Sequence, residues 1–144
     1  MKIEFTILGN PKALKRHRTY TKGEGGRPLP FPMQVDPSKA DKGSFLAMSQ
    51  QYAPPMPLDW PLALEVSFYF KRPKDHYRTG KFSHELKPDA PYWHTSTPDC
   101  DNLVKFICDA LNTVFWKDDS RVCRMIIFKE YSDKPRTEIS IKKL

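Results

Sequence analysis

Hydrophobic and polar positions alternate in several segments of the chain. Residues 2–8 read KIEFTIL and residues 62–70 read LALEVSFYF. Alternation with a period of two is typical of half-buried strands, so we predict strands in both segments. Residues 121–128 (RVCRMIIF) and 137–141 (TEISI) have the same character, and we predict a hairpin in which the SDKP turn at 132–135 joins them.

A helical pattern replaces this alternation between residues 98 and 122. Five apolar residues recur at positions i, i+3, i+4, i+7 and i+8, which is the spacing of one buried helical face: Leu103, Phe106, Ile107, Ala110 and Leu111. Asp101 or Asn102 is suited to cap its N-terminus. Residues 36–52 have a helix-compatible composition and end at two prolines, so we predict a second helix there.

These elements predict an α+β protein with a small mixed sheet and about two main helices. A chain of 144 residues suits one domain, and we expect residues 1–144 to form it. No leader with a charged and then an apolar part is evident, and no apolar run approaches the ~20 residues that span a membrane. We therefore expect a cytoplasmic protein that does not contact a membrane.

The charge of the chain indicates a partner rich in phosphates. The net charge is +7, with a pI of about 9.3. Residues 12–27 carry six basic residues and one acidic residue, Glu24, and three glycines predict a flexible loop. The basic residues are Lys12, Lys15, Arg16, Arg18, Lys22 and Arg27. Phosphate contacts are favoured over an ordinary solvated loop, above all for Lys12, Lys15, Arg16 and Arg18.

A second basic segment, residues 71–97, combines prolines with scattered aromatic residues. Two interpretations remain open for it. It is either a surface loop whose aromatic side chains pack on the body, or a flap whose basic residues follow a DNA backbone while an aromatic ring stacks on an unpaired base. The candidate DNA contacts at its start are Lys71, Arg72 and Lys74.

Acidic residues gather in and around the helix at residues 98–122, in a chain that is otherwise basic. Asp101, Lys105 and Asp109 follow one helical stripe at intervals of four residues, Asp99 precedes the helix, and Asp118 and Asp119 follow it. Taken singly, these are ordinary features: helix caps, an Asp-Asp turn and an intrahelical ion pair of ~0.3–0.5 kcal/mol. Together they favour a hard divalent metal ion held by carboxylates.

The run PDCDNLVKFICDALN with WKDD after it resembles the signature of the RusA family of Holliday junction resolvases, small magnesium-dependent endonucleases. The basic segment after Pro11 is similar to the opening segment of that family. Two positions depart from its pattern. Thr113 stands where a glycine is common, and Arg121 stands where a glutamine is common. The first departure affects the turn after the helix, because glycine there would permit a left-handed cap.

The resemblance implies the following roles. Asp99, Asp101 and Asp119 would bind Mg²⁺, with Mn²⁺ as a possible substitute, and Lys105 would be the accompanying catalytic lysine. Asp118 is an additional candidate ligand. The implied protein is a RusA-like homodimer that nicks branched DNA, above all four-way junctions, in recombination and repair. A C₂ dimer also suits the near two-fold symmetry of such a junction.

Two other functions remain open. One is a non-catalytic basic DNA-binding module whose acidic cluster is structural. The other is a phosphatase-like phosphotransferase in which the DxD motif supplies an aspartyl nucleophile, an arrangement that requires the motif at the end of a buried strand. Three cysteines without CxxC spacing indicate reduced thiols, and a zinc site built from His94, Cys100 and Cys108 is a less favoured alternative.

Overall fold

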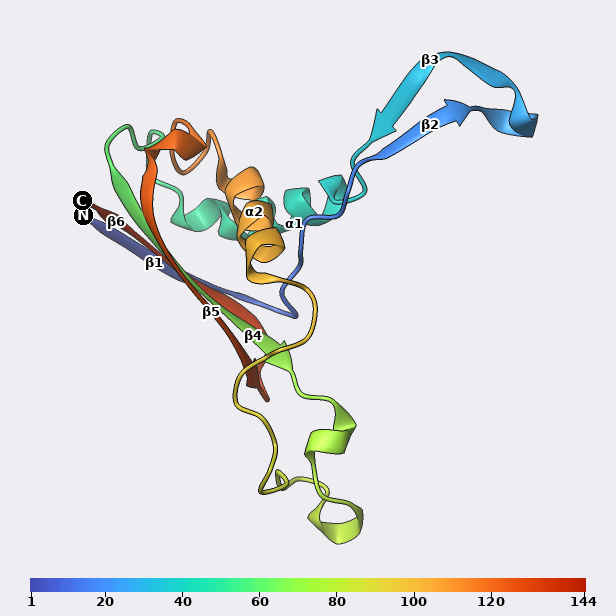
Figure 1. Cartoon of the computed structure of the whole chain (residues 1–144). Helices are drawn as coiled ribbons and strands as arrows, with labels where there is room; N and C mark the ends of the chain where they lie inside the picture. The colour runs from blue at the N-terminus through green and yellow to red at the C-terminus, as the bar shows by residue number, and fades with distance from the viewer.

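A four-stranded sheet with two helices on one face forms the body of the protein, which the computed structural model describes over residues 1–144 (Figure 1). The strands are β1 (Lys2–Leu8), β4 (Leu62–Lys71), β5 (Val122–Ser132) and β6 (Arg136–Lys143), in the order β1-β6-β4-β5. The pair β4–β5 is parallel and the other pairs are antiparallel. The sheet is therefore mixed, as predicted for an α+β fold.

The predicted hairpin of the last two strands is wrong. β5 and β6 are consecutive in sequence, yet β4 lies between them and is bonded to both. The reason is burial, because β4 has the most apolar sequence and takes an inner position of the sheet, where its side chains join the hydrophobic core. Its residues Leu62, Leu64, Val66 and Phe68 are at most 1% exposed. A turn pattern between two strands does not show whether these strands pair with each other or whether a third strand lies between them.

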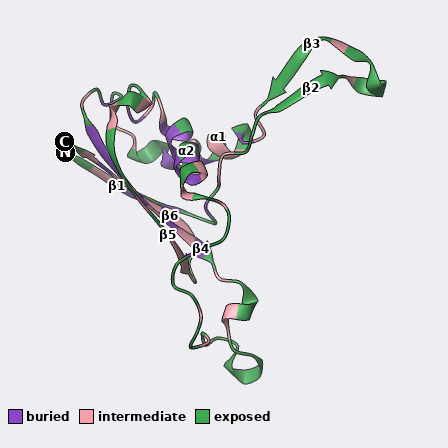
Figure 2. Ribbon diagram, in the orientation of Figure 1, coloured by how far each residue is buried: buried purple, intermediate pink, exposed green.

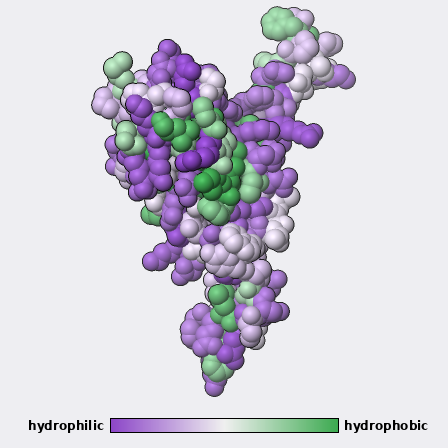
Figure 3. All heavy atoms as spheres, turned by 60° about the vertical axis from the view of Figure 1, so that its left-hand side comes forward, coloured by the Kyte–Doolittle hydropathy of each residue, from purple (hydrophilic) through white to green (hydrophobic).

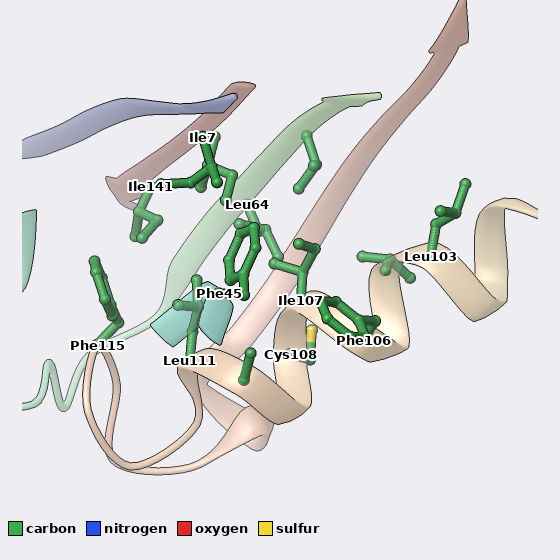
Figure 4. Close-up of a cluster of buried hydrophobic side chains, with 14 of the residues drawn as sticks. Ile7, Phe45, Leu64, Leu103, Phe106, Ile107, Cys108, Leu111, Phe115 and Ile141 are labelled. Atoms are coloured by element: carbon green, nitrogen blue, oxygen red, sulfur yellow. The ribbon is translucent and has the colours of Figure 1, made fainter. Parts of the chain in front are cut away.

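Both predicted helices are present, and they cover the same face of the sheet. They are α1 (Lys39–Ser49), which continues into the short 3₁₀ turn η2 (Gln50–Tyr52), and α2 (Cys100–Leu111). Buried residues concentrate in α2 and the strands beneath it (Figure 2). Leu103, Phe106, Ile107 and Leu111 of α2 point toward the sheet (Figure 4), as their spacing predicted. Neither helix has the length and apolar character needed to cross a membrane.

The basic segment after Pro11 is not a flexible loop throughout. It leads into an arm, formed by the antiparallel strands β2 (Arg18–Lys22) and β3 (Pro28–Val35) with the short turn η1 (Glu24–Gly26) between them. Three prolines in the sequence PLPFPMQV hide β3 from a propensity argument. The arm projects from the body and is almost entirely exposed (Figure 2).

Residues 72–97 form a lobe that projects from another part of the body, so both projections stand clear of it (Figure 3). The lobe contains the 3₁₀ turns η3 (Lys74–His76) and η4 (Gly80–Phe82). Its last residues run along the free edge of β5, where His94 N–H donates to the Lys129 carbonyl at 3.1 Å. The His94 ring is buried and stacks on Phe70, while Tyr92 and Trp93 are more than half exposed. The surface-loop interpretation therefore holds for His94, whose ring packs on the body, and the flap interpretation stays a prediction for the exposed Tyr92 and Trp93.

Candidate active site

The start of α2 presents two carboxylates that the fold does not use for capping. Asp99 occupies the N-cap position with extended backbone, and its side chain accepts no capping hydrogen bond. Asp101 lies in the first turn, where the positive end of the helix dipole favours an anion. The prediction that Asp101 or Asn102 caps this helix is wrong, because the helix begins at Cys100 and Asp99 takes the N-cap position. The side chain of Asp99 makes no capping hydrogen bond, so its oxygens remain available to a ligand.

Lys105 follows one turn later, beside Asp101. Its Nζ lies 3.9 Å from Asp101 Oδ2, which is the intrahelical pair expected from the spacing. Both side chains are more than 60% exposed. An exposed pair at this distance contributes little stability, so both groups can turn toward a phosphate or an ion at small cost.

Lys129 fixes the segment that leads into this helix. Its Nζ donates hydrogen bonds to the carbonyl oxygens of Ser96 at 2.6 Å and of Pro98 at 2.8 Å. Pro98 immediately precedes Asp99, so the lysine on β5 sets where the DxD motif begins. Sequence reasoning missed this residue. The signal was a lysine at a position where the alternation of Met125, Ile127 and Tyr131 calls for an apolar side chain.

Asp118 and Asp119 have different environments at the far end of the site. Asp118 Oδ2 accepts from Ser120 N–H at 2.9 Å and caps the 3₁₀ turn η5 (Asp119–Arg121). Hydrogen bonding from the side chain of Ser120, and then from its backbone N–H, holds the pKa of Asp118 below its usual value. Asp119 Oδ1 accepts from the buried Trp116 Nε1 at 2.8 Å. Burial raises the pKa of Asp119, and the nearby Asp109 and Asp118 raise it further.

Asp109 belongs to the same acidic cluster, because its carboxylate is one of the groups that raise the pKa of Asp119. It lies eight residues beyond Asp101, about 12 Å along the helix axis at 1.5 Å per residue. Lys42 Nζ of α1 lies 3.6 Å from Asp109 and 2.6 Å from Asp36, a contact that sequence reasoning did not find. Burial and the carboxylates of Asp119 and Asp109 raise the pKa of the Cys108 thiol to about 12. Cys108 is therefore a neutral core residue.

The turn that carries Asp119 is anchored to the segment before β4. Asp59 accepts from Lys117 Nζ at 3.1 Å and from Arg121 Nε at 2.7 Å, and these partners lower its pKa. The backbone of residue 58 also bonds to residues 115 and 117. Arg121, one of the two departures from the family pattern, thus helps to hold this turn in place.

The structure does not gather the predicted ligands into a ready-made cage. No three His, Cys, Asp or Glu side chains converge closely enough to hold a metal ion. The donor set nevertheless suits a hard divalent cation, because carboxylate oxygens are the ligands such ions prefer. Asp99 is free of capping bonds, and Asp119 has one oxygen bonded to Trp116. Without a cation, mutual repulsion favours separated carboxylates.

Basic residues flank the start of α2. Leu14 N–H donates to the Asn102 carbonyl at 3.0 Å and Lys15 N–H donates to the buried Ser38 Oγ at 2.8 Å, so the backbone carrying Lys12, Lys15 and Arg16 is fixed beside the DxD motif. At the end of β4, Lys71 N–H donates to Asn10 Oδ1. Lys74 is exposed in η3.

Arg72, also predicted to contact DNA, makes structural contacts with the lobe and with β5. Its Nη1 donates to the Pro91 carbonyl at 2.7 Å, and its guanidinium lies over the Tyr131 ring. Sequence reasoning gave this arginine no such role.

Two alternative site chemistries find no support in the geometry. The DxD motif follows an irregular segment and opens a helix, whereas an aspartyl nucleophile of the phosphatase type would sit at the end of a buried strand. His94, Cys100 and Cys108 do not assemble as a zinc site, because no metal-holding group of side chains is present and Cys108 is buried in the core.

Comparison with known proteins identifies the family of the chain. A family model described as endodeoxyribonuclease RusA matches residues 9–142. The chain is also similar to the uncharacterized protein YqaN of Bacillus subtilis (strain 168), with 32% identity over 142 residues that cover 99% of this chain and 96% of that protein. The match includes the DxD motif, Lys105 and Asp119 within one continuous region. The chain therefore belongs to the RusA family of endodeoxyribonucleases.

Proposed function

We propose that this protein is a magnesium-dependent endodeoxyribonuclease that resolves four-way DNA junctions by paired nicks. Family membership implies an endodeoxyribonuclease that acts on branched DNA such as Holliday junctions. The observation that carries the finer proposal is the start of α2. The carboxylates of Asp99 and Asp101, which make no capping hydrogen bond, lie there beside Lys105. The basic segment that carries Lys12, Lys15 and Arg16 is fixed next to them. Carboxylates next to a phosphate-binding surface are suited to an ion that bridges protein and DNA.

Asp99, Asp101 and Asp119 would hold the ion. Asp118 would be a further ligand through Oδ1, because its Oδ2 accepts the hydrogen bond from Ser120 N–H. When bound, Mg²⁺ supplies a water of lowered pKa and polarises the phosphoryl group, and Mn²⁺ would substitute for it. The positive charge of the ion would neutralise the mutual repulsion of these carboxylates. Trp116 holds one oxygen of Asp119, which would leave the other oxygen to the ion.

Lys105 would act on the scissile phosphate. Attack on a phosphodiester increases negative charge on the phosphoryl oxygens, and a nearby ammonium stabilises that charge. The lysine pairs with Asp101 in this structure, and its exposure leaves it free to exchange that partner for a phosphate. Lys105 would therefore contact the reacting phosphate, whereas Lys129 would position the segment that leads into the DxD motif.

DNA would be held by the basic residues around this site. Lys12, Lys15, Arg16 and Arg18 stand at the base of the arm, and Lys71 and Lys74 stand at the start of the lobe. Arg72 would reach a phosphate only by leaving the Pro91 carbonyl, so we assign it mainly to the lobe. Such contacts are sequence-independent and position the DNA.

Two copies of the chain would act together. A four-way junction is nearly two-fold symmetric, and a C₂ dimer with one acidic site per subunit would place two cuts symmetrically. Sedimentation of the protein with and without junction DNA tests this part, and a single subunit bound to the junction would contradict it.

The central test compares three DNA substrates of matched sequence: a four-way junction, a flap and a plain duplex. Each is incubated with Mg²⁺ or with chelator and analysed on denaturing and native gels. We expect symmetric nicks in the junction only with Mg²⁺, and tight junction binding in both conditions. Binding without cleavage in Mg²⁺ and in Mn²⁺ would instead indicate a non-catalytic DNA-binding module.

A further inference from the structure

The β2–β3 arm has one apolar face that nothing in the protein covers. Tyr20 pairs with Met33 and Arg18 pairs with Val35 across the two strands, and directly opposed residues point to the same face. Phe31 lies two residues before Met33, in the stretch of β3 where the register against β2 shifts, and it adds a third large apolar side chain to the exposed surface of the arm. Phe31 is 73% exposed and Met33 is 51% exposed. Hydrophobic atoms gather at the outer end of the arm in Figure 3.

An isolated two-stranded ribbon gains little stability from its own ladder, so an uncovered apolar face on it is unfavourable unless a partner uses it. Strand addition by another protein is disfavoured. Pro28, Pro30 and Pro32 occupy alternate positions of β3, and proline offers no N–H to an added strand. At the edge of β3 a partner would therefore meet side chains and not backbone N–H groups, and the exposed apolar face offers such side chains.

The charge of the arm indicates which partner that is. The arm carries three basic residues, Arg18, Lys22 and Arg27, and one acidic residue, Glu24. Three more basic residues lie at its base: Lys12, Lys15 and Arg16. The arm of a second copy seated on this face would set Arg18, Lys22 and Arg27 against the same basic residues. DNA offers phosphates to the basic residues. Where bases are unstacked, it also offers aromatic faces to the apolar side chains.

The base of the arm is fixed next to the active site. Leu14 N–H bonds to the Asn102 carbonyl in the first turn of α2, and Lys15 N–H bonds to Ser38 Oγ, just before α1. Eight residues of β3 extend about 26 Å at 3.3 Å per residue. A DNA strand held at Asp99 and Asp101 would therefore lie at the foot of an arm long enough to reach neighbouring nucleotides.

We propose that the β2–β3 arm binds the branch point of the DNA, where Phe31 and Tyr20 stack on unstacked bases and the basic residues at its base contact the flanking phosphates. A plain duplex exposes base edges in its grooves but not base faces, so this contact distinguishes a branch from a duplex. The inference rests on the proposed function, because it presumes that branched DNA is the substrate. It assigns base stacking to the arm, in addition to the phosphate contacts expected of its basic residues.

The test compares Phe31→Ala with Met56→Ala, a control whose side chain is equally exposed at 76% and lies between α1 and β4. Binding is measured by fluorescence anisotropy in chelator, so that cleavage plays no part, with 2-aminopurine placed at the branch point. We expect Phe31→Ala to weaken junction binding about ten-fold and to remove the 2-aminopurine response, while duplex binding is unchanged. Phe31→Trp should retain both signals, and Met56→Ala should change neither.

Several outcomes would overturn the proposal. One is unchanged junction binding by Phe31→Ala. Another is an equal loss on junction and duplex, which would place the arm in an ordinary groove. A third is a fall in sedimenting mass for Phe31→Ala, which would make the arm a contact between copies of the chain. A wild-type protein that does not prefer the junction to the duplex would contradict the proposed function itself. A preference that Phe31→Ala retains would count against the arm alone.

Discussion

Thr113 closes α2 in the left-handed conformation, with a φ of 69°, and it is the only non-glycine residue with positive φ in the chain. This conformation costs an L-residue roughly 1–2 kcal/mol, and more for a β-branched side chain. Glycine removes this cost but loses roughly 0.5–1 kcal/mol through the greater freedom of the unfolded chain. The Thr113 side chain is exposed, so its removal loses little packing. Thr113→Gly should therefore stabilise the fold by about 0.5–1 kcal/mol.

Calorimetry or a thermal melt checks this value, which corresponds to a rise in Tm of about 1–4 °C for a domain of this size. Thr79→Gly is the matched control, because Thr79 is also exposed but has a φ of −101°. That variant should lose stability or stay unchanged, since only the unfolded-state term applies. A fall in Tm for Thr113→Gly, or equal shifts in both variants, would refute the assigned strain.

Three further predictions concern the active site and the DNA surface. Lys129→Met releases the carbonyls of Ser96 and Pro98, so it should slow junction cleavage about ten-fold or more and weaken the dependence of the rate on Mg²⁺, while junction affinity stays unchanged. Lys129→Arg should recover part of the rate, and a wild-type rate for Lys129→Met would contradict the positioning role of Lys129. Neutralising Lys15, Arg16 and Arg18 together should weaken binding to every DNA and lower the slope of log K against log salt by up to about 2.7; titrations at several salt concentrations measure this, and an unchanged slope would argue against phosphate contacts. Mg²⁺ at 100 times its Kd should stabilise the wild-type protein by about 2.7 kcal/mol but leave Asp99→Asn/Asp101→Asn almost unaffected; equal shifts of Tm in both proteins would place the ion elsewhere.

The apolar patterns predicted most of the body. The alternation in β1 and β4 and the helical period of α2 arise from the side chains that make the core, so sequence and burial agree there. The neighbours of β5 and β6 were not predictable in the same way. Strand order depends on which strand gains most from a central position, and that is a property of the assembled sheet.

The arm and part of the site depend on contacts between residues distant in sequence. β3 has three prolines and no buried face, so neither propensity nor periodicity indicates a strand. The candidate carboxylates were chosen from their spacing and from the family resemblance. The residues that fix their surroundings come from other elements: Lys129 bonds the carbonyls of Ser96 and Pro98, Lys42 pairs with Asp109, and Asp59 binds Lys117 and Arg121. No local sequence pattern connects these residues to α2.

The central claim is that the carboxylates at the start of α2 hold the ion that cleaves DNA. Single-turnover cleavage of a four-way junction in Mg²⁺ tests it most directly, with the protein in excess over DNA. The comparison is Asp101→Asn against Asp133→Asn, which removes the same charge from the β5–β6 turn. We predict that Asp101→Asn cleaves at least about 100-fold more slowly than wild type while binding the junction with equal affinity, and that Asp133→Asn behaves as wild type. Cleavage by Asp101→Asn at the wild-type rate would contradict the account.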